Sequence, residues 1–125
     1  LDFRKIFFRG ARIRIQDYVA LHKTSLSFLK QAVNKSTAEH VIVVTHHVPS
    51  MAVVSDDHKM SPINSGFATE LGNWIADTRI TYWIYGHSHV SLEVCVGQTR
   101  IVSNQLGYIG LGEGKDYCKT KLLEL

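Results

Sequence analysis

Two histidine-containing segments, each following an apolar run, hold the residues best suited to chemistry. His87 and His89 in "YGHSHV" follow one run, and His46 and His47 in "VTHHVPS" follow another. Imidazoles at alternate positions of an extended segment point the same way, about 7 Å apart, and can bind one metal ion or two neighbouring ions. If the two runs are adjacent strands of one sheet, the histidines meet at one edge, which predicts a metal site there.

The apolar periodicity predicts the elements that must position these histidines. We expect a mixed loop and extended piece at 1–15, helices at 16–35 and 65–78, buried strands at 40–45 and 81–86, a hairpin at 91–104 turning at Gly97-Gln98, and a further strand at 115–125. Asp17 and Ser65 are the expected helix caps. This order predicts an α/β fold with helices packed on a sheet.

Composition and charge narrow the class of protein. A chain of 125 residues, 45% of them hydrophobic, suits about one globular domain, and no run is long enough to cross a membrane. We expect Cys95 and Cys118 to be free, mostly packed thiols. Residues 1–35 hold eight Lys and Arg against two Asp, which suits either an anionic partner such as a phosphate ester or a solvated basic face. No nucleic-acid-binding motif occurs. We expect a cytoplasmic location.

The two histidine segments together resemble the last two of five motif blocks in calcineurin-like metallophosphoesterases. "VVTHHVPS" matches the strand-end histidine block and "YGHSHV" the Gly-His-x-His block. "ALHKTSLSFLKQA", "INSGFATELGNWI" and "GQTRIVSNQLGY" are similar to segments of bacterial members, so the resemblance covers much of 1–110. It implies a four-layer α/β/β/α sandwich that hydrolyses phosphoesters, as a phosphatase or a phosphodiesterase.

The chain departs from that family because the three earlier blocks are missing: Asp-x-His, Gly-Asp, and Gly-Asn-His-Asp or -Glu. Asp56-Asp57-His58 has the form of the first block, but it lies between the two late blocks and so in the wrong order. We therefore expect residues 1–125 to be the C-terminal portion of a single metallophosphoesterase domain whose N-terminal half is missing. Such a fragment should be inactive alone and prone to homo-oligomerisation through exposed strand edges.

The resemblance also implies roles for individual residues. His46 and His87 would bind one divalent ion and His89 a second, the ions being Mn, Fe, Zn or Ni. His47 would contact the metal ligands without binding the metal, or it would face the substrate. His58 and Asn104 are candidate phosphoester contacts, although a structural turn is the preferred interpretation for Asn104, as it is for Tyr108.

Two other interpretations remain open from the sequence. The chain could be a non-catalytic metal-binding or scaffold module that retains the histidines. It could also be a hydrolase that uses a single metal ion held by these histidines alone. The residues encoded before Leu1 would decide the first alternative, and metal stoichiometry would decide the second.

Overall fold

Two compact units make up the chain, Leu1–Ser36 and Thr37–Leu125. The computed structural model describes residues 2–54 and 68–125. In these described ranges no helix is both long enough and apolar enough to span a membrane. The histidine segments of interest belong to the second unit.

The first unit is dominated by one long helix. Its elements are α1 (Asp2–Lys5), β1 (Phe7–Phe8), β2 (Ala11–Arg12) and α2 (Ile15–Lys35). The helix predicted at 16–35 is therefore confirmed. The assignment of Asp17 as its N-cap is wrong, because the backbone is still extended at Arg14, which takes that position. Asp17 lies one turn inside, and its carboxylate accepts hydrogen bonds from the Arg14 backbone N–H and Nε, each at 3.0 Å.

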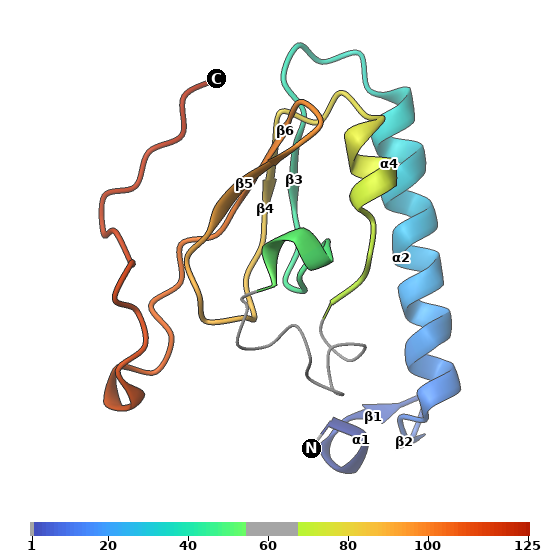
Figure 1. Cartoon of the computed structure of the whole chain (residues 1–125). Coiled ribbons are helices and arrows are strands. Elements are labelled where there is room, and N and C mark those ends of the chain that lie inside the picture. Colours follow the sequence, from blue (N-terminus) through green and yellow to red (C-terminus); the bar gives the residue numbers. More distant parts are fainter. Residues whose placement is uncertain (1, 55–67) are drawn as a thin grey trace. The chain divides into compact units, whose positions relative to one another are not determined.

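The second unit is built on a four-stranded sheet (Figure 1). Its elements are β3 (Ile42–Val44), the 3₁₀ helix η1 (Met51–Val53), α4 (Gly72–Ala76), β4 (Tyr82–Ile84), β5 (Glu93–Val96), β6 (Thr99–Val102) and the 3₁₀ helix η3 (Ile109–Leu111). The strand order is β3-β4-β6-β5. β3, β4 and β6 run parallel, and β5 pairs antiparallel with β6. The chain is therefore an α/β protein, as predicted.

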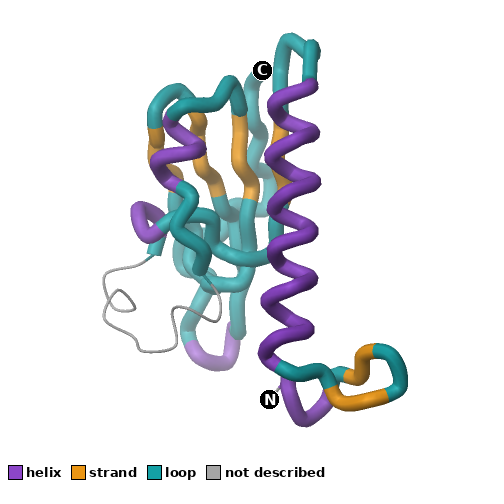
Figure 2. The backbone as a smooth tube through the Cα atoms, turned by 90° about the vertical axis from the view of Figure 1, so that its right-hand side faces the viewer, coloured by secondary structure: helices purple, strands orange, loops and turns teal. Residues whose placement is uncertain are grey.

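The predicted strands near 40–45 and 81–86 are confirmed as β3 and β4, and the predicted hairpin as β5 and β6 with its turn at Gly97-Gln98. The strand predicted at 115–125 is wrong, because this segment is irregular (Figure 2). Side chains hold it instead: Lys121 pairs with Glu93 at 2.9 Å, and the Tyr82 hydroxyl donates to the Glu124 carbonyl at 2.7 Å.

The helix predicted at 65–78 is much shorter in the structure. Only α4 is helical, and the predicted cap at Ser65 lies outside the described residues. Ala68, expected inside the helix, instead forms a parallel bridge with Val48 in the segment after β3. α4 still contributes to the core, because the Trp74 ring meets the Trp83 ring edge-on at 6.0 Å.

The central strand β4 is buried, but the edge strand β3 is not. Tyr82 and Trp83 are each 1% exposed, whereas Ile42 is 46% and Val44 70% exposed. The prediction that β3 is buried on both faces is wrong, because β3 is the outermost strand of the sheet in the described part of the chain and only Val43 turns inward. The prediction for the cysteines is half right, since Cys95 and Cys118 are free but exposed.

Candidate metal centre

The parallel pairing of β3 with β4 brings His46 and His87 together. Val44 pairs with Ile84, and the Gly86 N–H donates to the His46 carbonyl at 3.1 Å, so both strands end level with each other. His46 Nε2 lies 2.9 Å from His87 Nδ1. The two imidazoles thus meet at the carboxyl edge of the sheet, where open α/β sheets place their ligands.

His47 completes a cluster of three imidazoles. Its ring centroid lies 5.3 Å from that of His46 and 4.9 Å from that of His87. The backbone here is tied to the core through Thr45, whose hydroxyl donates to the His47 carbonyl at 2.9 Å and accepts from Trp83 Nε1 at 2.9 Å. Because Trp83 is buried, the position of this loop is fixed from inside the unit.

The segment carrying His87 and His89 has unfavourable backbone conformations. Both residues have left-handed conformations, with φ of 70° and 54°. Such conformations cost non-glycine residues about 1–2 kcal/mol each and persist where surrounding contacts impose them. Gln105 supplies those contacts, because its side chain accepts from the His89 N–H at 2.8 Å and donates to the Ser88 hydroxyl at 2.9 Å and the Val90 carbonyl at 3.0 Å.

His89 lies in a separate group of side chains. Its Nδ1 is 3.0 Å from Glu113 Oε2, and its ring meets the Tyr108 ring edge-on at 4.6 Å. His89 therefore contacts Glu113 and Tyr108, whereas the imidazoles of His46, His47 and His87 contact one another.

The donor set fits a shared metal ion for His46 and His87. Two nitrogens each about 2.1 Å from one ion lie about 3.0 Å apart at the right angle of an octahedral ion and about 3.4 Å apart at a tetrahedral one, and these two nitrogens are 2.9 Å apart. Within the described ranges no three His, Cys, Asp or Glu side chains form a group that could hold a metal ion. A complete centre would therefore need further ligands beyond this pair.

Asn104 and His58 are the remaining candidate residues. Both ends of the Asn104 side-chain amide bind the backbone of Cys118, at 2.8 and 2.9 Å, so Asn104 anchors the C-terminal segment. Its role as a substrate contact remains a prediction. His58 lies outside the described residues.

Two residues of this edge, Gln105 and Glu113, were missed by sequence reasoning. Gln105 had a usable signal, because it follows the third parallel strand, β6, and so reaches the same edge as the histidines. Glu113 had none, because it arrives through an irregular loop 24 residues beyond His89.

A carboxylate clamp holds the loop that follows the first histidine segment. Glu70 accepts hydrogen bonds from the Met51 N–H at 2.7 Å, the Gly72 N–H at 2.6 Å and the Ser50 hydroxyl at 3.1 Å. Burial raises the pKa of Glu70, but these three hydrogen bonds together outweigh it, so the pKa lies below its ordinary value.

This clamp predicts an acid-dependent loss of stability. A carboxylate with a lowered pKa stabilises the fold above its unfolded pKa of 4.5, and the contribution disappears as pH falls through the folded pKa. Glu70→Gln should lower the free energy of unfolding at pH 7 by only about 1 kcal/mol, because the group is partly exposed and screened by water. In denaturant titrations the difference from wild type should shrink as the pH falls below 4.5 and through the lowered pKa of the folded state. Glu39→Gln serves as the control, and a pH-independent difference would contradict the clamp.

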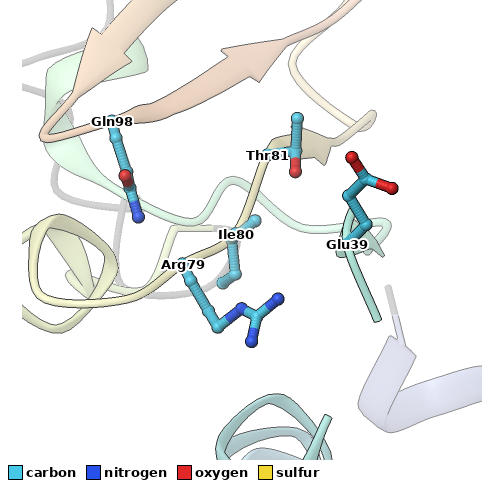
Figure 3. Close-up of a pocket in the computed structure, with 5 residues that line it drawn as sticks. All are labelled: Glu39, Arg79, Ile80, Thr81 and Gln98. Carbon is cyan, nitrogen blue, oxygen red and sulfur yellow. The ribbon is translucent and has the colours of Figure 1, made fainter. Parts of the chain in front are cut away.

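At the opposite edge of the sheet lies a cavity of about 230 Å³, lined by Glu39, Arg79, Ile80, Thr81 and Gln98 (Figure 3). Its residues precede β3, β4 and β6, whereas the histidines follow β3 and β4. Arg79 donates to the Ala38 carbonyl and Gln98 to the Thr78 carbonyl, so these polar groups serve the backbone. The carboxyl edge of the sheet, where the histidines lie, holds the side chains that are better suited to binding a metal ion.

Comparison with known proteins finds no family model, no curated protein and no solved structure that matches this chain. Any chemical role of the carboxyl edge of the sheet is therefore inferred from the side chains found there. Those residues are a close imidazole pair, a third imidazole beside it, and His89 with its own carboxylate partner.

Proposed function

We propose that this chain supplies the late histidine ligands of a calcineurin-like metallophosphoesterase, with His46 and His87 on one divalent ion and His89 on a second. One observation carries the proposal: His46 Nε2 and His87 Nδ1 lie 2.9 Å apart where two adjacent parallel strands end. The four-stranded sheet would be one of the two sheets of an α/β/β/α sandwich. The N-terminal half of that domain would supply the other sheet and the carboxylate ligands.

The residues of this chain would orient the substrate as well as hold ions. Two divalent ions bound here would acidify a bound water and screen the phosphoryl charge. His47, whose ring lies 4.9 Å from that of His87, would donate a hydrogen bond to a phosphoryl oxygen. Imidazole nitrogens bind Mn, Fe, Zn and Ni, so this donor set does not select among them.

Two other functions compete with this proposal: a hydrolase that uses one ion held by these histidines alone, and a scaffold module that binds metal without turnover. Metal stoichiometry separates the first from a two-ion centre, and an activity assay separates the second.

The proposal predicts metal-dependent hydrolysis by a longer protein that carries this chain and the three earlier motif blocks. With added Mn²⁺ it should cleave an aryl phosphate monoester, an aryl diester or both, whereas the 125-residue chain alone should show no turnover. His87→Ala should abolish the activity by removing a metal ligand.

His22→Ala is the matched control, because His22 lies on α2 in the other unit. Full activity in the His87→Ala protein would place the chemistry elsewhere. Metal binding by the longer protein without turnover of either ester would instead favour the scaffold module.

A further inference from the structure

The imidazole of His89 has a carboxylate partner in the loop after β6. Glu113 Oε2 lies 3.0 Å from His89 Nδ1. A carboxylate can only accept hydrogen bonds, so the proton of this contact belongs to Nδ1. In the neutral ring, His89 Nε2 is then the nitrogen whose lone pair is available to a ligand.

The loop that carries Glu113 is shaped to deliver this contact. The Tyr108 N–H donates to the same oxygen, Glu113 Oε2, at 2.5 Å, and the Tyr108 ring packs edge-on against the His89 ring. Gly107 has a φ of 61°, and a Cβ there would come within 2.6 Å of Glu113 Oε2 and 3.2 Å of His89 Cβ. Gly114 has a φ of 78°, and a Cβ there would collide with the Leu106 carbonyl. Side chains at these two positions would therefore push Glu113 away from His89.

The contact between His89 and Glu113 contributes little to the stability of the fold. The His89 and Glu113 side chains are 36% and 32% exposed, and ion pairs at that exposure contribute about 0–1 kcal/mol. What the contact does fix is the orientation and tautomer of a ring whose backbone is already held by Gln105. Histidines that bind metals commonly have such a hydrogen-bond acceptor on the other ring nitrogen.

We infer that Glu113 is a positioning residue that holds His89 as the Nδ1–H tautomer and leaves Nε2 to bind an ion at the sheet edge. The identity of that ligand as a divalent ion rests on the proposed function, whereas the tautomer does not. The positioning acts through two points, the acceptor oxygen on Nδ1 and the Tyr108 ring against the imidazole.

Nitrogen-15 NMR of the histidine rings in the metal-free chain tests the tautomer directly. Wild-type His89 should be almost wholly Nδ1–H. In Glu113→Ala the Nε2–H tautomer should become populated, because the acceptor is gone. Glu113→Gln keeps an acceptor oxygen and should retain most of the wild-type tautomer. Glu124→Ala, a change at another carboxylate of the C-terminal segment, should leave His89 unaltered.

A Zn²⁺ titration followed on the His89 Nε2 signal gives the second readout. Glu113→Ala should weaken the binding seen at Nε2 by about 10–100-fold. An unchanged His89 tautomer in Glu113→Ala would overturn the inference even if Zn²⁺ still bound. A wild-type His89 signal that never responds to Zn²⁺ would instead remove His89 from the proposed metal ligands, while a tautomer change in Glu113→Ala would still support the positioning role.

Discussion

Replacing His87 with glycine should remove most divalent-ion binding at the carboxyl edge of the sheet while leaving the fold intact. The imidazole supplies one of the two nitrogens that meet at 2.9 Å, so divalent-ion affinity should fall by at least about 100-fold. The backbone conformation at this position, in contrast, favours glycine over histidine. His87 has a φ of 70°, which costs a non-glycine residue about 1–2 kcal/mol. Glycine relieves that cost but loses about 0.5–1 kcal/mol to chain entropy, so stability should stay within about 1 kcal/mol of wild type.

Calorimetric titration with Mn²⁺ or Zn²⁺ and denaturant unfolding measure the two effects separately. His40→Gly is the matched control, because it removes an imidazole that precedes β3 instead of following it. Wild-type affinity in His87→Gly would contradict the site. A loss of more than about 2 kcal/mol in unfolding free energy would contradict the backbone argument.

The second large effect concerns association of the chain with itself. β3 is the outermost strand of its sheet in the described part of the chain, and Ile42 and Val44 expose 46% and 70% of their surface. Unpaired edges pair with other chains, and exposed apolar side chains add to the affinity. We therefore expect concentration-dependent association of the 125-residue chain in light scattering.

Val44→Lys should weaken this association by about tenfold or more, since burying a valine contributes about 1.5–3 kcal/mol and a buried lysine opposes it. Val19→Lys makes the same substitution at an exposed position of α2 and should leave association unchanged. A wild-type chain that stays monomeric at every accessible concentration would show that β3 is not an adhesive edge.

The sequence predicted the meeting of His46 and His87 because that meeting follows from a general rule. Parallel strands end at the same edge of a sheet, and each of these histidines directly follows an apolar run. The α2 helix and the β5–β6 hairpin were predictable for a similar reason, since local periodicity and turn residues specify both.

Other features depend on distant partners and could not be predicted. Glu113 reaches His89 from 24 residues away through an irregular loop. The burial of β3 was mispredicted because a continuous apolar run looks the same whether its strand is central or at an edge. The helix at 65–78 was overextended because Glu70, which fits a helical pattern, instead binds the backbone at Met51 and Gly72.

The most direct test of the central claim is a Zn²⁺ titration followed by nitrogen-15 NMR of the seven histidines in this chain. We expect His46 Nε2 and His87 Nδ1 to shift together, with the same affinity, because both bind one ion. His40, which precedes β3 instead of following it, should stay unchanged. Zn²⁺ that shifts other histidines and leaves this pair untouched, or that binds His46 and His87 with different affinities, would contradict a shared metal site.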